Sequence, residues 1–369
     1  MYKQLISPLL DQLDSETWHT RARGALHLAE STPLGLKLLE QFSYRQRHFR
    51  DARLRVVLGG IEFENPLMVG AGWDKAGKAV RGLYTLGFAG VEIGTVTACA
   101  QPGNPKPRQF MLAPGVALNR LGFNSPGMDA VARNLARYRN DGIPIGISLG
   151  KNRDVPARDA PEAHAVVARR LYRYAAYFAL NVSSPNTPGL RSLQDRGPLT
   201  EIVQAVNAAM DELGSRKPLF VKIAPELSER ALADVIEVVL ENGLTGIIAI
   251  NTTNDPALKA QYGERWRNEE GGLSGDNPDF RRLATRTIAS IYRATAGKIE
   301  IIGVGGVKDT ETALEKIRAG ARIVQVVTAI RGEGPTLPGR IIRGLALYME
   351  KEGLKSLDEI RGTKAPAFR

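Results

Sequence analysis

The side chains best suited to chemistry gather in one stretch, Asn181-Val182-Ser183-Ser184-Pro185-Asn186-Thr187-Pro188-Gly189-Leu190-Arg191. Its asparagines and serines supply amide and hydroxyl groups, which both donate and accept hydrogen bonds. The prolines stiffen the backbone, and Gly189 permits a positive φ. The stretch therefore suits a small polar ligand. By itself it is equally well explained as a turn without chemistry, since turns favour the same residues.

The elements around this loop alternate between short apolar runs and helical patterns. Eight apolar or β-branched runs predict strands at 67–70, 90–93, 143–149, 177–182, 219–223, 246–250, 299–304 and 323–327. Helical patterns follow them at 76–86, 127–138, 161–175, 198–213, 228–241, 279–295, 309–318 and 339–350. Eight such units predict an α/β fold, a (β/α)₈ TIM barrel. A doubly wound sheet is the competing fold, but the turn at 70–74 lacks the third glycine of its phosphate motif.

In a TIM barrel the chemistry lies at the carboxyl ends of the strands, and phosphate commonly binds in the loops after strands seven and eight. Strand seven ends in Gly303-Val304-Gly305-Gly306-Val307, and Asp309 then opens a helix. Such glycines let backbone N–H groups approach an anion closely. Strand eight leads into a second glycine-containing loop at 328–335. A phosphate-bearing ligand is expected here, and glycines that serve only tight turns are the alternative.

The other predicted strands also end in polar side chains. These are Lys75, Thr95, Thr97, Ser148, Lys151, Asn152, Asn251, Thr252 and Thr253, together with the loop at 181–191. Lys222 is the most informative lysine, because it interrupts an apolar strand. A lysine that points into a barrel is costly unless a negative group meets it. A structural salt bridge would explain it, but the phosphate loops favour a cofactor contact.

Residues 1–55 differ from the rest of the chain. A predicted helix begins at Ser15, a second begins near Pro33, and five arginines follow between positions 45 and 55. Amphipathic helices beside arginines are typical of a segment on an anionic membrane surface. Two helices packed on the main body, with the arginines in solvent, are the more common alternative. A hairpin is predicted at 56–63, with Gly59-Gly60 as its turn.

Composition limits the class of protein. The 369 residues are 43% hydrophobic, enough for a large core, and their formal charge of +11 favours an anionic ligand, lipid or nucleic acid. No nucleic-acid-binding motif is recognisable, and no apolar run reaches the ~20 residues of a membrane span. A single Cys99 and four histidines without ligand spacing predict neither a disulfide nor a metal site. No secretory signal is recognisable at 1–10, so the protein is expected to stay inside the cell.

With these strand ends placed, the sequence resembles class 2 dihydroorotate dehydrogenases, the FMN-containing, quinone-dependent type, over nearly the whole chain. The resemblance rests on an ordered set of motifs at 1–3, 13–14, 65–66, 71–75, 94–97, 103–108, 119–124, 181–191, 221–225, 251–253, 271–275 and 303–306. Each motif is weak alone, but their order is specific.

The resemblance implies oxidation of (S)-dihydroorotate to orotate in de novo pyrimidine (UMP) biosynthesis, with hydride transfer to FMN and re-oxidation by a membrane quinone. It implies substrate contacts at Lys75, Asn119, Arg120, Leu121, Gly122, Phe123, Asn181, Asn186, Asn251 and Thr252. It implies FMN contacts at Ala71, Gly72, Lys75, Thr95, Ser148, Asn181, Lys222, Ile250, Gly275, Gly305, Gly306, Val327 and Thr328. Asparagines suit this substrate, because a cyclic imide needs donors and acceptors side by side.

In this family a base removes a proton from C5 of the substrate while a hydride passes from C6 to the flavin, and matching positions make Ser184 that base. A serine hydroxyl is a weak base at neutral pH and needs a desolvated, hydrogen-bonded setting. Class 1 relatives carry cysteine at this position, whereas Cys99 lies near the second strand. The resemblance is therefore to class 2. Ser183 receives no role.

Three places depart from the family pattern. Ser148 stands for the usual asparagine, Val327-Thr328 for an aromatic residue and serine, and Ala98-Cys99-Ala100 for a proline-rich stretch. The shorter hydroxyl at 148 is expected to keep one flavin contact and lose another. Backbone N–H groups are expected to hold the phosphate at 327–328. The third change concerns the shape of a loop near the quinone entrance, not the reaction.

In class 2 enzymes the N-terminal helices form the mouth of a quinone tunnel. The resemblance therefore divides the chain into a membrane- and quinone-access segment, residues 1–55, and an FMN-binding barrel, residues 56–369. It implies that Arg108 lies at the inner end of the tunnel and that lipid or quinone meets Trp18, Leu34, Leu38 and Phe42. The expected location is the cytoplasmic side of the cell membrane, with peripheral attachment. A monomer that binds no nucleic acid is expected.

Two other functions compete with this one. A flavin-containing barrel that acts on tRNA uridines would need a cysteine acid and an RNA-binding extension, and neither is recognisable. A phosphate-binding relative without catalysis would hold a flavin that dihydroorotate never reduces.

Overall fold

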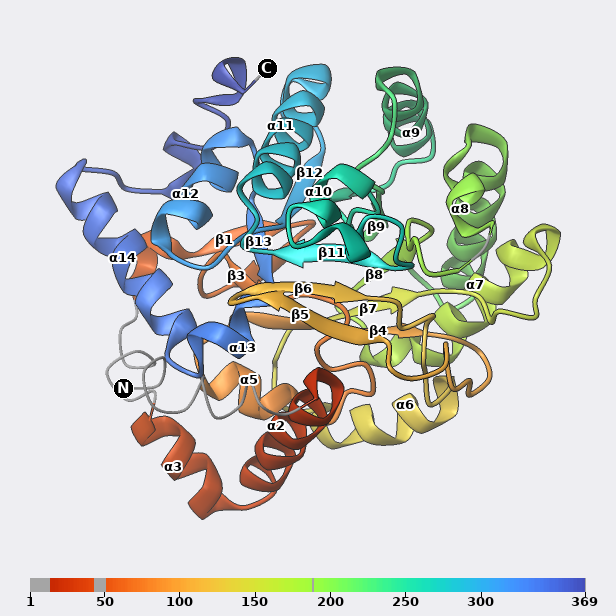
Figure 1. Cartoon of the computed structure of the whole chain (residues 1–369). Coiled ribbons are helices and arrows are strands. Elements are labelled where there is room, and N and C mark those ends of the chain that lie inside the picture. Colours follow the sequence, from red (N-terminus) through yellow and green to blue (C-terminus); the bar gives the residue numbers. More distant parts are fainter. Residues whose placement is uncertain (1–13, 43–50, 188, 369) are drawn as a thin grey trace.

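The computed structural model of the chain describes residues 14–42, 51–187 and 189–368 (Figure 1). Eight parallel strands close into a barrel, in the order β3, β4, β7, β8, β9, β10, β12 and β13. Their bounds are Leu67–Val69, Gly90–Val96, Ile145–Leu149, Tyr177–Asn181, Leu219–Lys222, Gly246–Ala249, Glu300–Val304 and Ile323–Val326. The predicted TIM barrel and its eight strands are confirmed.

Helices follow the strands and surround the barrel. They are α5 (Val80–Thr85), α6 (Met128–Leu135), α7 (Ala160–Leu171), α8 (Arg196–Asp211), α9 (Glu229–Glu241), α10 (Pro256–Ala260), α11 (Pro278–Thr295), α12 (Thr310–Ala319), α13 (Ala329–Glu333) and α14 (Leu337–Lys351). Local signals set where they begin. The Ser228 side chain caps α9, and Asp309 forms a reciprocal capping box with Thr312 at the start of α12.

Short 3₁₀ turns complete the helical structure. They are η2 (Ala52–Leu54), η3 (Ala136–Tyr138), η4 (Ala157–Asp159), η5 (Tyr172–Tyr174), η6 (Leu190–Gln194), η7 (Glu264–Trp266), η8 (Leu357–Glu359) and η9 (Ala365–Ala367). The predicted hairpin is also present, as β1 (Val56–Leu58) paired antiparallel with β2 (Ile61–Phe63). Gly59 and Gly60 both have positive φ, as a tight hairpin turn requires.

A separate three-stranded antiparallel sheet was not predicted. Its strands are β5 (Gln109–Ala113), β6 (Val116–Asn119) and β11 (Gly272–Gly275), with β6 in the middle. In Figure 1 the sheet crosses the centre of the view, between the barrel helices above and the N-terminal helices below. Because β11 is half glycine and pairs with a segment far away in the sequence, its pattern carries no local strand signal.

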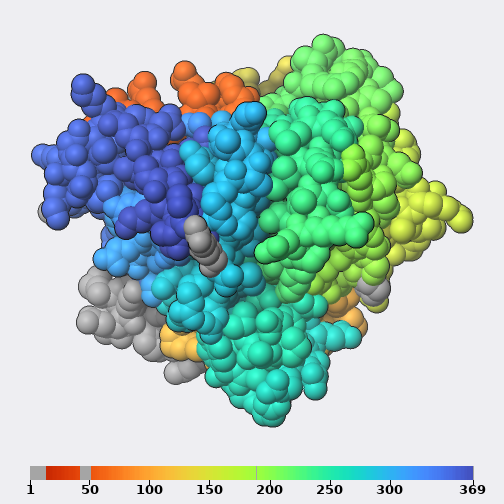
Figure 2. Space-filling model, turned by 90° about the horizontal axis from the view of Figure 1, so that it is seen from above, coloured from red at the N-terminus to blue at the C-terminus, as the bar shows by residue number. Residues whose placement is uncertain are grey.

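The N-terminal part contributes two helices, α2 (Ser15–Glu30) and α3 (Pro33–Phe42). The buried Glu30 carboxylate accepts hydrogen bonds from the Gly82 backbone N–H and the Tyr138 hydroxyl, and burial raises the pKa of Glu30. The red of these helices is not seen on the face of the molecule shown in Figure 2. Among the described helices, none is long and apolar enough to cross a membrane.

The barrel interior holds a small polar group within an apolar core. Glu92 on β4 accepts hydrogen bonds from Tyr177 on β8 and Gln325 on β13, both at 2.8 Å, and all three side chains are buried. Lys222 is only 5% exposed. Burial lowers the pKa of Lys222, and the negative charge of Glu92 opposes this shift. Glu92 therefore supplies a negative charge that partly compensates for burying this lysine.

Candidate active site

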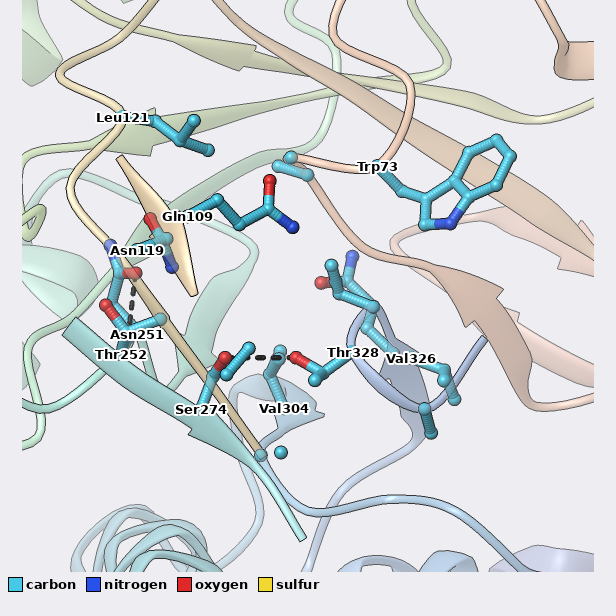
Figure 3. Close-up of a pocket in the computed structure, with 18 of the residues that line it drawn as sticks. Trp73, Gln109, Asn119, Leu121, Asn251, Thr252, Ser274, Val304, Val326 and Thr328 are labelled. Carbon is cyan, nitrogen blue, oxygen red and sulfur yellow. Dashed lines mark hydrogen bonds between the residues drawn. The ribbon is translucent and has the colours of Figure 1, made fainter. Parts of the chain in front are cut away.

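One large cavity opens at the carboxyl ends of the barrel strands. Together with its open mouth it encloses about 1430 Å³. Figure 3 shows part of its lining, with Trp73 on the side opposite to Asn251 and Thr252. Strand ends of the barrel and the β5–β6–β11 sheet all contribute side chains to the wall.

Most of the residues proposed from the sequence line this cavity. They are Ala71, Gly72, Lys75, Thr95, Asn119, Leu121, Gly122, Phe123, Asn181, Ser184, Asn186, Lys222, Ile250, Asn251, Thr252, Gly275, Gly305, Gly306, Val327 and Thr328. Two proposed residues do not. Ser148 lies behind the wall, where its hydroxyl is 3.0 Å from that of Thr95. The Arg120 guanidinium points outward, to Glu269 and the Phe110 ring.

The end of the cavity near β12 and β13 is suited to a phosphate. Gly305 and Gly306 have φ of 118° and 75°, and neither backbone N–H donates to another described residue. Both amides are therefore available to an anion, as at other phosphate sites. Lys308 adds a positive charge, paired with Asp276. The Thr328 and Ser274 hydroxyls, 3.0 Å apart, link this end to β11 (Figure 3).

The opposite wall carries the amide side chains. The Asn186 amide nitrogen donates to Asn119 Oδ1 at 3.2 Å, whereas Asn186 Oδ1 is buried without a hydrogen-bond partner among the described residues. A buried acceptor of this kind is costly when it stays unpaired. It therefore fits a ligand that brings an N–H group.

Ser184 lies in the same wall and is 5% exposed. Its Oγ accepts a hydrogen bond from the Asn186 backbone N–H at 3.2 Å. A donor in this position stabilises negative charge that develops on the oxygen, and burial removes competing water. The setting is thus the desolvated, hydrogen-bonded one that a serine base needs.

Lys75 differs from an ordinary surface lysine. Its Nζ donates to Asn124 Oδ1 and lines the cavity. Burial, and next the positive charge of Arg108, lower the pKa of Lys75 from 10.5 to about 7. Near neutral pH its charge therefore depends on what the cavity holds.

Trp18, which was expected to meet lipid or quinone, lines the cavity, as do Val304, Val307, Ala329 and Arg331 of the two expected phosphate loops. Sequence reasoning gave no individual role to the other residues that line it. They are His19, Trp73, Gln109, Met111, Ala117, Ser274, Asp276, Phe280, Lys308, Gln325 and Val326. Those on the three-stranded sheet could not be found without that sheet. Gln325 lies within the eighth strand, β13, and could have been found from its position there.

The cavity continues to the N-terminal helix α2. His19 Nε2 donates to the Trp73 carbonyl at 2.5 Å, and burial lowers the pKa of His19 to about 4, so the ring is neutral at physiological pH. Trp18 is 7% exposed, and the Arg331 guanidinium lies 5.2 Å from its ring centre. Arg108 pairs with Glu16 of α2 at 2.7 Å and does not line the cavity.

Other residues singled out near the N-terminus are distributed differently. Leu34 and Leu38 are 69% and 60% exposed on α3. The Phe42 side chain lies outside the described residues, as do Arg45, Arg47, Arg50 and the motifs at 1–3 and 13. Pro188, one of the two loop prolines, is also outside them, while Gly189 adopts a φ of 69°.

The loop with Ala98-Cys99-Ala100, which departs from the proline-rich family pattern, is held by side-chain hydrogen bonds. The Asn152 side-chain amide forms two hydrogen bonds with the Cys99 backbone, each 3.0 Å long. This pairing holds the loop after β4 without prolines. Among the described residues, no group of His, Cys, Asp and Glu side chains could hold a metal ion.

The chain is similar to known proteins of the dihydroorotate dehydrogenase family. The model of the family described as "Dihydroorotate dehydrogenase" matches residues 53–349. A protein named dihydroorotate dehydrogenase (quinone) from Rhizobium rhizogenes is 45% identical, with 85% of this chain and 86% of the relative covered. One of the same name from Gloeobacter violaceus is 44% identical, with 97% and 98% covered. The structure of a DHODH from Eimeria tenella in complex with ferulenol gives a TM-score of 0.85 at 31% identity, covering 95% of each chain.

Proposed function

Because the chain belongs to the dihydroorotate dehydrogenase family, in its quinone-dependent class, we infer that it oxidises (S)-dihydroorotate to orotate in pyrimidine biosynthesis. We propose FMN as the resident flavin and a membrane quinone as the electron acceptor. The observation that carries the proposal is the pairing, across one cavity, of free backbone amides at Gly305 and Gly306 with the amide wall around Ser184.

The residues present fit the flavin and the substrate. Gly305, Gly306 and Thr328 would hold the phosphate, and Lys222 and Thr95 would meet the ring system deeper in the barrel. When bound, FMN supplies a two-electron acceptor for the hydride from C6. The substrate ring would lie against Asn119, Asn181, Asn186, Asn251 and Thr252. Lys75 lines the same cavity and would reach both ligands.

Ser184 is then the residue that takes the C5 proton. Ser184 lines the part of the cavity where the substrate would lie, and the Asn186 N–H supports negative charge on its Oγ. Arg191 holds the loop from behind, with an ion pair to Glu226 at 2.9 Å and a hydrogen bond to Asn254 at 3.1 Å. Positioning by a rigid wall reduces the cost of bringing the base to the substrate.

The test of this function is an absorption spectrum. Purified protein should be yellow, and dihydroorotate should bleach the flavin band in the absence of oxygen. A colourless protein that cannot be loaded with FMN would exclude the proposal. A bound flavin that dihydroorotate never reduces would instead favour a relative without catalysis.

The pH dependence of substrate binding should report on Lys75. With a pKa of about 7 in the free protein, Lys75 is neutral above that pH, and binding the substrate carboxylate must first take up a proton. We expect the KM for dihydroorotate to be flat below pH 7 and to rise up to ~10-fold per pH unit above it. Steady-state KM between pH 6 and 9 measures this.

The matched control is Lys75→Gln, which keeps a donor but has no proton to gain. Its KM should be higher overall and nearly independent of pH in the same range. A wild-type KM that stays constant up to pH 9 would contradict the assignment, because Lys75 would then be charged throughout.

We further propose that residues 1–55 form a membrane- and quinone-access segment and residues 56–369 the flavin-binding barrel. Support comes from the cavity, which extends to Trp18 and His19 on α2, and from the exposed leucines of α2 and α3. Leu34 and Leu38 are separated by one helical turn, and the exposed Lys37 lies beside them. An apolar face with a basic neighbour suits the surface of an anionic membrane. We propose peripheral attachment of a monomer on the cytoplasmic side.

Serine at both exposed leucines of α3 should weaken membrane binding. In Leu34→Ser/Leu38→Ser, apolar area that would enter the lipid interface is lost, and we expect vesicle affinity to fall ~10-fold or more. Co-sedimentation with vesicles that contain anionic phospholipid measures this. Flavin reduction by dihydroorotate should stay at the wild-type rate, while turnover with a long-tailed quinone should fall.

The control carries the same change on the opposite side of the barrel. Leu213→Ser/Leu240→Ser alters two leucines that are 43% and 50% exposed, after α8 and on α9. Its vesicle binding should equal that of the wild type. Equal losses in both double variants would mean that general surface hydrophobicity, not α3, mediates attachment.

A further inference from the structure

Ser183 lies directly behind the amide wall of the cavity. It is 0% exposed and is not among the residues that line the cavity, unlike its neighbours Asn181 and Ser184. Its hydroxyl is therefore in no position to touch a substrate. It nevertheless contacts two residues that do face the cavity, Asn181 and Asn251.

The contacts of Ser183 run in both directions. Its Oγ–H donates to Asn181 Oδ1 at 3.3 Å, and its Oγ accepts from Asn251 Nδ2 at 3.0 Å. Asn251 Nδ2 also donates to Asn181 Oδ1 at 3.2 Å. The three side chains thus form a closed triangle of hydrogen bonds, in which the hydroxyl serves as donor to one amide and acceptor from the other.

Neighbouring groups extend this triangle and remove its remaining freedom. Asn181 Nδ2 donates to Thr95 Oγ1 at 2.6 Å, and Thr95 Oγ1 is 3.0 Å from Ser148 Oγ. Asn251 Oδ1 accepts from the Thr252 backbone N–H at 2.8 Å. Each amide is therefore held at both its oxygen and its nitrogen.

Few hydrogen-bonding groups of the Asn181 and Asn251 amides remain available to a ligand. Both hydrogens of Asn251 Nδ2 have acceptors, so this residue can offer only a lone pair on Oδ1. Asn181 Oδ1 already accepts two bonds, and its nitrogen uses one hydrogen on Thr95. The wall therefore presents one N–H from Asn181 and one carbonyl oxygen from Asn251, side by side. This pattern complements an N–H next to a C=O, as in an imide ring.

We propose that Ser183 is a positioning residue that sets the direction of the Asn181 and Asn251 amides and so selects a ligand with adjacent N–H and C=O groups. The proposal rests on the proposed function, since it takes these asparagines as substrate contacts. Without the hydroxyl, the Asn251 amide nitrogen loses one hydrogen-bond acceptor, and the Asn181 amide oxygen loses one hydrogen-bond donor. Each amide is then held by one hydrogen bond fewer and can more easily turn over and present the wrong group to the ring.

Orotate affinity of the flavin-loaded protein tests this role. Titration of orotate against the absorption spectrum of the bound flavin gives its Kd. For Ser183→Ala we expect a Kd about 10-fold higher, with flavin content and thermal midpoint close to those of the wild type. Ser192→Ala is the matched control, because Ser192 is an exposed residue of η6, directly after this loop, and its hydroxyl donates to Gly189 O at 2.7 Å. Its Kd should be unchanged.

A double-mutant cycle separates positioning from a general structural effect. If Ser183 acts through Asn251, then Ser183→Ala should raise Kd by at most ~3-fold when Asn251→Ala is already present. Equal factors in both backgrounds would overturn the proposal. Orotates methylated at a ring nitrogen add a second readout. The ratio of their Kd to that of orotate should be smaller for Ser183→Ala than for the wild type, most of all for the derivative that the wild type binds least.

Two further outcomes are distinguishable. If the alanine variant does not fold, Ser183→Cys keeps a similar volume with a weaker donor, and it should show the same rise in Kd. A wild-type flavin that does not respond to orotate would overturn the proposed function and this inference with it. A wild-type response that both Ser183 variants leave unchanged would overturn only the role of Ser183.

Discussion

Replacement of Ser184 by alanine should leave the protein yellow and lower the rate of flavin reduction by dihydroorotate about 10²- to 10⁴-fold, the range typical of removing a general base. The flavin is expected to stay because Ser184 lies on the amide wall, away from the phosphate end at Gly305 and Gly306. Anaerobic stopped-flow absorbance in a single turnover measures the rate directly, without the quinone step.

Orotate binding provides the internal control for this variant. Orotate is the product and keeps its remaining C5–H, so its binding involves no proton transfer and its Kd should change by less than about threefold in Ser184→Ala. A large loss of orotate affinity would show that the hydroxyl serves binding. Reduction at the wild-type rate would exclude Ser184 as the base.

Replacement of Lys222 by methionine should have two separable effects. The flavin loses a buried cationic donor, and we expect FMN affinity to fall about 10- to 100-fold. Glu92 loses its opposing charge and remains buried between Tyr177 and Gln325. A buried carboxylate without a compensating cation is costly, so the flavin-free protein should unfold at a lower temperature.

A second substitution separates the two effects. Glu92→Gln removes the stranded charge while keeping a side chain of the same shape, so Lys222→Met/Glu92→Gln should regain most of the lost stability. FMN affinity should stay low, since the cation is still missing. Calorimetry and flavin titration provide the two measurements. Recovery of FMN affinity in the double variant would mean that Lys222 affects the flavin only through the fold.

The barrel could be predicted from the sequence because parallel strands buried on both faces appear as continuous apolar runs, separated here by amphipathic helices. Closure of a barrel brings every strand end to one rim. Lys75, Thr95, Asn181, Lys222 and Asn251 could thus be assigned to one site from their positions after the strands alone. The phosphate end was predicted in the same way, from glycines after the seventh strand.

The β5–β6–β11 sheet was not predicted. Without it, the sequence offers no structural reason why Asn119 and Gly275 reach the cavity. Its strands are short, and β11 pairs with β6 across most of the barrel sequence. Only the resemblance to a family placed these two residues near a ligand. The same resemblance included Arg120 and Ser148, whose side chains the structure directs to Glu269 and to Thr95 instead.

The sequence by itself determined the fold, the rim where the chemistry lies and the residue types available there, because these depend on local pattern and strand order. Only the tertiary structure decided how those residues behave. Lys75 is an ordinary first-turn lysine in the sequence, and enclosure with Arg108 nearby lowers its pKa to about 7. In the loop at 181–191, Ser183 and Ser184 are adjacent and chemically identical. Ser184 nevertheless lines the cavity, whereas Ser183 lies behind the wall and contacts the two amides of Asn181 and Asn251. Desolvation and hydrogen-bond direction depend on neighbours distant in the sequence, so packing alone distinguishes the two serines.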